Sequence, residues 1–304
     1  MRALGMGGAF VAVADDASGT YWNPAGLVTG PVFSGVAEAA RSQVEDAPVN
    51  GGGDPLTGFA GRGSVLVALG TWPVGATFYR LSDATARVVG SGTQAQNVAA
   101  LRRLTTTHVG VNVLHSLVSG LHVGATVKYV HGSAGENLRS PVPGDPLEAA
   151  RDLETRGTSG FDMDAGVMAD LRIVKLGLTV RNLFEPEFDT DEIFRLQLPR
   201  QVRAGVAFRL TEALLVSLDT DLTQNPDVTG ERRSLAMGAE QRFWQDRAAV
   251  RGGVRVSTLG SARPLVTTGG SVSLRSGIFA DGYVAIGLDE ASPDGFGIGI
   301  RMVF

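Results

Sequence analysis

The sequence predicts an all-β fold, a transmembrane antiparallel β-barrel of about 14 strands with an N-terminal segment in its lumen. Three observations predict it. Apolar residues alternate with polar or small ones along most of the chain after Pro31. Long and short connections between the alternating segments follow each other in turn. Residues 1–31 fit no strand pattern, yet they are too apolar for a disordered tail.

Composition restricts the class of protein. The chain has 304 residues, no cysteine and a formal net charge of −4. The lack of cysteine excludes disulfides and thiolate metal sites, and the mild charge does not indicate a nucleic-acid partner. No apolar run reaches the roughly 18 residues of a transmembrane helix, whereas the strands of a membrane barrel are short and only half apolar. A helical membrane protein is therefore excluded and a membrane barrel is not.

The segment 161–171 shows the alternation most clearly. Phe161 and Val167 fall on one face of an extended chain, and Asp162 and Asp164 fall on the other. Segments 121–129 and 214–222 have the same pattern. A soluble sandwich or solenoid with its polar face in water would show it too, so the connections must distinguish the two.

Segments of this kind are expected as strands, each near the roughly 9–11 residues that a tilted membrane strand needs. They are 32–41, 60–71, 73–81, 105–117, 120–131, 161–171, 172–182, 200–210, 213–222, 233–243, 247–257, 265–275, 277–287 and 295–304.

The connections favour the membrane barrel. Longer polar loops follow the odd-numbered segments, at 42–59, 82–104, 132–160, 183–199 and 223–232. Tight turns follow the even-numbered ones, so one rim of the sheet carries the long loops, as in outer-membrane barrels with short periplasmic turns. The polar face would then line the lumen and the apolar face would meet lipid. Since lipid offers no hydrogen bonds to a sheet edge, the sheet must close.

The C-terminal segment points to the same membrane. Residues 296–304 alternate and end in the aromatic Phe304, which resembles the signal that barrel-insertion machinery recognises. We therefore expect the bacterial outer membrane as the location and its lipid as the surroundings, although no export signal precedes Met1 in this sequence.

Residues 1–31 are expected to form a hatch inside the barrel of residues 32–304. Eight strands leave only enough room for inward side chains, so a wider barrel is either plugged or an open pore. Asn23 suits a helix N-cap and Pro24 the first helical position, and Asp15 or Asp16 suits the cap of an earlier turn. Lumen-facing glycines would make room for the hatch: Gly110, Gly124, Gly166, Gly177, Gly205, Gly238 and Gly253.

The stretch RALGMGGAFVAVADDASGTYWNPAGL resembles the N-terminal signature of the FadL-type superfamily of outer-membrane barrels. That group includes long-chain fatty-acid and aromatic-hydrocarbon uptake proteins and relatives that serve type IX secretion. The resemblance implies fourteen strands and a hatch with an Asn-Pro-Ala motif, here Asn23, Pro24 and Ala25. Residues 177–188 and 198–206 are similar to short members, some related to conjugal-transfer proteins. The expected loops 82–104 and 132–160 are polar, unlike the extended apolar loops of the fatty-acid transporters.

The resemblance implies a channel for passive uptake of hydrophobic small molecules, such as long-chain fatty acids or aromatic hydrocarbons, without a cofactor. Phe10, Tyr21 and Trp22 are candidate ligand contacts, and packing of the hatch is the alternative role for all three. The candidate lumen charges are Asp219, Asp221, Glu240, Arg251 and Arg255. The arginines would meet a ligand carboxylate or, as the simpler expectation, pair with the three acidic residues across the lumen.

Two other classes of function compete with transport. A secretion-accessory or structural barrel that binds a protein partner suits the polar loops, and a sealed, salt-bridged lumen would favour it over a transporter. An enzyme is not expected, because His108, His115, His122 and His131 lack the spacing of a zinc helix motif. Asp162 and Asp164 are neighbours on one strand face, where lumen solvation or a cationic partner is the simpler role. No catalytic or metal-binding constellation is expected.

Overall fold

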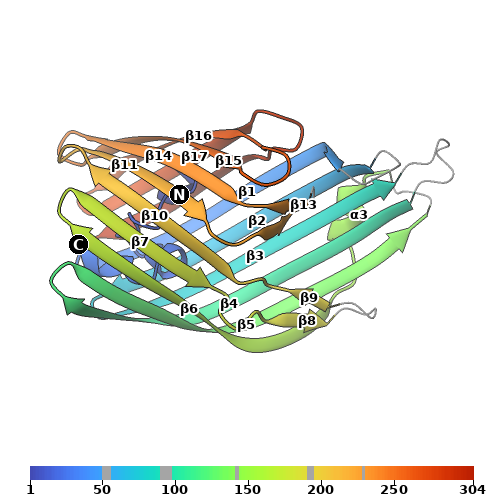
Figure 1. The fold of residues 1–304 in the computed structure, drawn as a ribbon, viewed down its shortest axis with the longest axis horizontal. Coiled ribbons are helices and arrows are strands. Elements are labelled where there is room, and N and C mark those ends of the chain that lie inside the picture. The colour runs from blue at the N-terminus through green and yellow to red at the C-terminus, as the bar shows by residue number, and fades with distance from the viewer. Residues whose placement is uncertain (50–55, 90–97, 141–143, 190–194, 228–229) are drawn as a thin grey trace.

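The computed structural model describes residues 1–49, 56–89, 98–140, 144–189, 195–227 and 230–304. These residues form a closed barrel of fourteen antiparallel strands, in which successive barrel strands pair and β1 pairs with β18 (Figure 1). Around the closure, the backbone of Phe304 exchanges hydrogen bonds of 2.9 and 3.0 Å with that of Phe33. The predicted fold class is confirmed.

The barrel strands are β1 (Phe33–Val49), β2 (Leu56–Thr71), β3 (Val74–Val89), β4 (Val98–Val118), β5 (Leu121–Arg139), β6 (Arg156–Leu171), β7 (Val174–Arg181), β10 (Gln201–Arg209), β11 (Leu214–Asp221), β14 (Ser234–Phe243), β15 (Ala248–Ser257), β16 (Leu265–Arg275), β17 (Ile278–Gly287) and β18 (Asp294–Val303). The helices and short strands outside the barrel wall are α1 (Arg2–Gly5), α2 (Gly19–Trp22), η1 (Gly26–Thr29), α3 (Pro146–Arg151), β8 (Glu187–Asp189), β9 (Arg195–Gln197), β12 (Asn225–Asp227) and β13 (Gly230–Arg232).

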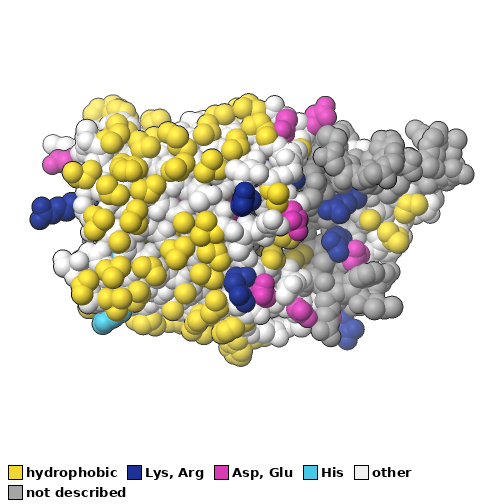
Figure 2. Space-filling view, in the orientation of Figure 1, with side chains coloured by type: hydrophobic (Ala, Val, Ile, Leu, Met, Phe, Trp, Pro, Cys, Tyr) yellow, Lys and Arg dark blue, Asp and Glu magenta, His cyan; other side chains and the backbone are white. Residues whose placement is uncertain are grey.

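The alternation in sequence separates the two faces of the wall. In β6, Asp162 and Asp164 are buried inside, whereas Phe161 is 71% exposed on the outside. In β11, Asp219 is buried and Leu218 is exposed. Figure 2 shows hydrophobic side chains over much of the outer surface on the half with the short turns, while charged ones gather toward the other end. The wall therefore presents an apolar surface outward, as a lipid-embedded barrel requires.

The strands differ from expectation at the end with the long connections. There β1 to β6 run for 16 to 21 residues each, whereas β7 to β18 in the wall have 8 to 11. The expected loops 42–59 and 82–104 are thus mostly strand, apart from 50–55 and 90–97, which lie outside the described residues. Strand pairing needs only backbone hydrogen bonds. These hairpins therefore continue beyond the part of the wall whose outer face must be apolar.

The other expected loops also contain regular structure. The expected loop 132–160 holds the end of β5, helix α3 and the start of β6, and the expected loops 183–199 and 223–232 hold the pairs β8–β9 and β12–β13. Asp145 caps α3 by accepting hydrogen bonds from the amides of Leu147 and Glu148. Leu147 and Ala150 pack with Leu101 of β4 in a small buried cluster, which holds α3 against the long hairpins.

None of the helices in the described ranges has the length and apolar character needed to span a membrane.

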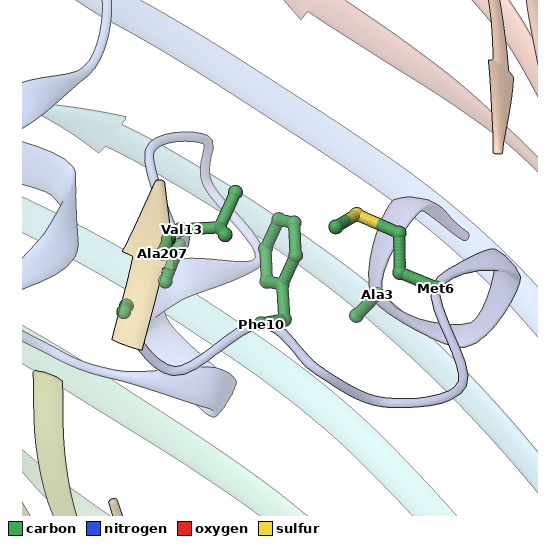
Figure 3. Packing of buried hydrophobic residues seen from close by; sticks show 7 residues of the cluster. Ala3, Met6, Phe10, Val13 and Ala207 are labelled. Carbon is green, nitrogen blue, oxygen red and sulfur yellow. The ribbon is translucent and has the colours of Figure 1, made fainter. Parts of the chain in front are cut away.

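Residues 1–31 fill the lumen near the short turns (Figure 1). They fold as α1, α2 and η1 with irregular segments between them, and residues 6 to 14 are all buried. Phe10 lies at the centre of their core, between Met6 and Val13 and against Ala207 of the wall (Figure 3). The apolar core of the molecule therefore sits inside the barrel, between hatch and wall.

Candidate functional site

The hatch touches the wall at glycines. A Cβ on Gly124 would lie 2.5 Å from the carbonyl carbon of Pro24, and one on Gly166 would overlap Oδ1 of Asn23. Glycines at three further wall positions approach the hatch backbone as closely: Gly177, Gly238 and Gly253. A Cβ on Gly205 would first meet Oδ1 of Asp219, and it would lie 3.2 Å from the hatch nitrogen of Ala12. Gly110 differs, because a Cβ there would meet the side chains of Thr126 and Lys128. Six of the seven expected glycines thus make room for the hatch, since only glycine permits such backbone contact.

Asn23 ties the hatch to itself and to the wall. Its side-chain Oδ1 accepts a hydrogen bond of 3.1 Å from the amide of Ala25, which closes a turn over Pro24. The expected place of Asn23 as an N-cap with Pro24 as the first helical residue is wrong, because η1 begins at Gly26 and Ala25 is its N-cap. Nδ2 of Asn23 donates to the carbonyl of Val11 at 2.9 Å and to that of Val167, in β6, at 3.1 Å. These two bonds fix α2 and η1 beside β6. A turn at Asn23 could be expected from local sequence, but the bonds to Val11 and Val167 join distant segments.

A buried charge cluster holds α1. The Arg2 guanidinium pairs with Asp16 at 2.8 Å, with Asp15 at 2.6 Å and with Glu240 of β14 at 3.0 Å. Burial works to lower the pKa of Arg2, but the charges of these acids raise it. Burial likewise works to raise the pKa of Asp16, while Arg2, Arg301 and a hydrogen bond from Ser18 outweigh it and lower the pKa to about 2. The hatch is therefore held by ion pairs that exist only while these groups are charged.

The expected lumen charges pair only in part as anticipated. Arg251 pairs with Glu240 at 2.6 Å, and also with Asp281 at 3.1 Å. Asp221 pairs instead with Arg203, at 2.6 Å, while Arg255 borders the cavity described below.

Asp219 departs furthest from the expectation of an arginine partner. Its Oδ2 accepts hydrogen bonds of 2.8 Å from the amides of both Phe10 and Val11. Those two amides belong to an irregular part of the hatch, so they have no partner in regular secondary structure. The carboxylate therefore supplies the acceptor that this part of the hatch lacks.

Above the hatch lies a cavity of about 790 Å³. Apolar and aromatic residues that line it include Tyr21, Trp22, Leu66, Leu81, Leu104 and Leu198. The side chain of Phe10 is fully buried in the hatch core and lines no part of this cavity, which agrees with packing of the hatch, the alternative role for this candidate contact. Trp22 lies between the hatch core and the cavity, with its ring 6.2 Å from that of Phe10.

Four rings border the cavity on one side, and we call them the ring cluster: Tyr21, Trp22, Tyr79 and His108. Tyr21 meets Trp22 edge to face at 5.4 Å and Tyr79 in the same way at 5.2 Å, while His108 stacks on Tyr79 at 4.1 Å. The guanidinium of Arg181 lies 3.7 Å from the centroid of the Tyr21 ring. Tyr21 and Trp22 were expected from the sequence. Tyr79, His108 and Arg181 were not, because they come from three different strands that only the fold brings together.

A buried lysine, Lys128, forms ion pairs with both aspartates of β6. Nζ of Lys128 lies 3.0 Å from Asp162 and 2.7 Å from Asp164, and it also donates to the Tyr79 hydroxyl and to Oδ1 of Asn182. The carboxylates thus have the cationic partner that their place on one strand face suggests. Within the described parts of the chain, no group of three or more His, Cys, Asp or Glu residues is placed to hold a metal ion.

Three comparisons place the chain among known proteins. A sequence model described as "F plasmid transfer operon, TraF, protein" matches residues 35–221. None of the curated proteins compared with the chain matches it.

Solved outer-membrane barrels share the fold at low sequence identity. The toluene transporter TbuX of Ralstonia pickettii is 14% identical with a TM-score of 0.65, over 100% of this chain and 97% of that one. The monoaromatic hydrocarbon channel CymD is 15% identical with a TM-score of 0.64, over 100% and 97%. A FadL homologue of Pseudomonas aeruginosa is 11% identical with a TM-score of 0.62, over 100% and 98%. The chain has the FadL-like fold of fourteen-strand outer-membrane barrels, and it belongs to the family described as the TraF protein of the F plasmid transfer operon.

Proposed function

We propose that this protein is an outer-membrane channel for the passive uptake of hydrophobic small molecules. The cavity above the hatch carries the proposal. Its volume of about 790 Å³ and its lining of leucines and aromatic rings match the concave, mostly apolar sites that bind small molecules. The shared fold with a toluene transporter and a monoaromatic hydrocarbon channel supports it.

Uptake would proceed without energy input. A molecule enters from the end with the long connections and packs in the cavity against Tyr21 and Trp22, both of which belong to the hatch. Below these residues the lumen is filled, since residues 6 to 14 are buried. Release then requires a movement of the hatch or of the wall beside it, and Arg2 and Asn23 are the contacts that such a movement would break.

The second candidate is a structural or secretion-accessory barrel that binds a protein partner. Two observations favour it: the family description refers to a plasmid transfer operon, and ion pairs such as Arg2–Glu240 and Arg251–Glu240 seal the lumen around α1. It predicts that the cavity stays empty in the purified protein.

Native mass spectrometry of the barrel, purified in mild detergent from bacterial outer membranes, separates the two. We expect bound apolar molecules in the wild-type protein and their loss in Trp22→Ala, which removes a ring from the cavity. Trp244→Ala is the control, because that side chain is 78% exposed on the outside at a short turn, and it should keep the bound molecules. An empty wild-type barrel that carries a stoichiometric protein would overturn the channel and favour the scaffold.

A further inference from the structure

Arginines outnumber acidic residues in the part of the cavity lining that the structure describes. Among the described residues that line the cavity are eight arginines and four acidic residues. Three of these arginines form ion pairs with lining acids, namely Arg62 with Asp83, Arg102 with Glu136 and Arg203 with Asp221. A neutral hydrocarbon would gain nothing from this excess of arginines, whereas the field of such a lining attracts anions.

Arg181 is the arginine whose own contacts point to a ligand. Its guanidinium lies over the Tyr21 ring at 3.7 Å, and no described carboxylate lies within ion-pair distance of it. Its Nε is buried without a hydrogen-bond partner among the described residues. The nearby Asp164 accepts hydrogen bonds through Oδ1, from Lys128 and from the amide of Asn182, and not from Arg181. Because Arg181 lines the cavity, an oxygen anion there would give its guanidinium a charge-assisted hydrogen bond through donors other than the buried Nε.

The ring cluster beside Arg181 indicates what the rest of the ligand is. Tyr21 meets both of its aromatic neighbours edge to face, at 5.2 and 5.4 Å, and all of these rings border the cavity. A further flat ring can join such an arrangement with the offset or edge-to-face geometry that aromatic pairs prefer. An alkyl chain would fill the same space without that preference.

We propose that the cavity binds an aromatic carboxylate, with its ring against Tyr21, Trp22 and Tyr79 and its carboxylate on Arg181. This inference rests on the proposed uptake function and specifies the substrate class of the same cavity. The guanidinium, fixed on Tyr21, presents its donors to the carboxylate oxygens. The ligand is thus distinguished from neutral aromatic hydrocarbons by its charge and from fatty acids by its ring.

Calorimetric titration of the purified barrel in detergent tests the proposal with three probes: naphthalene-2-carboxylate, naphthalene and dodecanoate. We expect the aromatic carboxylate to bind most tightly to the wild-type protein. Arg181→Gln should weaken its binding about ten-fold or more, because a charge-assisted hydrogen bond is lost, and should leave naphthalene unchanged. Arg181→Lys keeps the charge without the planar fork, so its affinity for naphthalene-2-carboxylate should fall between that of the wild type and that of Arg181→Gln.

Two further variants supply a control for the substitution itself and a test of the ring contact. Arg209→Gln removes an exposed arginine at the short-turn end of β10 and should bind all probes as the wild type does. Tyr21→Leu keeps Arg181 and should weaken naphthalene-2-carboxylate more than dodecanoate.

The outcomes separate this inference from the function on which it rests. Naphthalene that binds as tightly as its carboxylate, with no effect of Arg181→Gln, would overturn the anion site and leave hydrophobic uptake standing. Dodecanoate that binds more tightly than the aromatic acid would overturn the aromatic part. A wild-type barrel that binds none of the three would overturn both the inference and the proposed function.

Discussion

At the scale of the residue, the hatch fits against the wall because the wall has glycines, which lack a Cβ, at the points of contact. Gly124 leaves the space that the backbone of Pro24 and Ala25 occupies, and Asn23 supplies the hydrogen bonds beside it. A Cβ at position 124 would lie 2.5 Å from the Pro24 carbonyl carbon and 2.7 Å from the Ala25 nitrogen. Both are backbone atoms, so neither can move by a change of rotamer.

We therefore expect Gly124→Ala to loosen the hatch. Overpacking of this kind typically costs about 1–3 kcal/mol, and hydrogen exchange of the amides of residues 10–27 should show a matching loss of protection. Gly63→Ala is the matched control, because Gly63 lines the same lumen and a Cβ added there would meet no heavy atom within 4 Å. Equal protection in Gly124→Ala and the wild type would show that the hatch does not rest on the wall there.

Residue identity alone predicted some of the site. We could expect a turn at Asn23, the place of Tyr21 and Trp22 at the cavity, and the wall glycines, because turn chemistry and strand alternation are local properties. The two roles considered for Phe10 could not be separated, since sequence does not tell a residue at the centre of the hatch from one at its surface. The pairs Arg2–Glu240 and Asp219 with the Phe10 amide join positions more than 200 residues apart, and no local pattern records them.

At the scale of the element, the strand ends at the two rims differ in how well they could be predicted. At the short turns the expected segment 120–131 and the observed start of β5 at Leu121 agree closely, because turn residues interrupt the alternation abruptly. At the other rim β5 continues to Arg139. Beyond the lipid the outer face of a hairpin is solvated and no longer has to be apolar, so the apolar alternation stops before the strand does.

The hatch is the element whose stability should depend on pH. The pKa of Asp16 is lowered from its usual 3.8 to about 2 in the folded protein. A depressed pKa contributes stability that is present above the unfolded value and is lost as the pH falls toward the folded one. The hatch should therefore be fully protected above about pH 4 and should lose protection between about pH 4 and about pH 2.

Hydrogen exchange of residues 2–22, corrected for the intrinsic pH dependence of amide exchange, measures this effect. Asp16→Asn should be less protected at neutral pH by roughly 2 kcal/mol and should show a smaller further loss in acid. Asp152→Asn, an exposed site after α3, should match the wild-type profile. An unchanged acid profile in Asp16→Asn would mean that the Arg2 cluster does not hold the hatch.

At the scale of the whole molecule, the protein is a barrel closed at one end and hollow toward the other. Ion pairs and glycine contacts seat residues 1–31 near the short turns, and the cavity of about 790 Å³ lies above them. The fold class and strand number followed from the sequence. The cavity did not, because its volume depends on how far the hatch extends into the lumen and on the long hairpins of β1 to β6.

The central claim is that this cavity takes up hydrophobic molecules from outside the cell. The chain has no cysteine, so one introduced thiol reports on one position. Ser82→Cys places it in the cavity lining, and Leu138→Cys places it on an exposed site at the long-connection end of β5.

The decisive measurement is the rate at which a membrane-impermeant maleimide labels each variant in intact bacteria, with and without naphthalene-2-carboxylate and naphthalene. We predict that both thiols are labelled and that an added compound slows labelling at position 82 alone. Labelling at 138 but none at 82, or labelling at 82 that neither compound slows, would contradict the central claim.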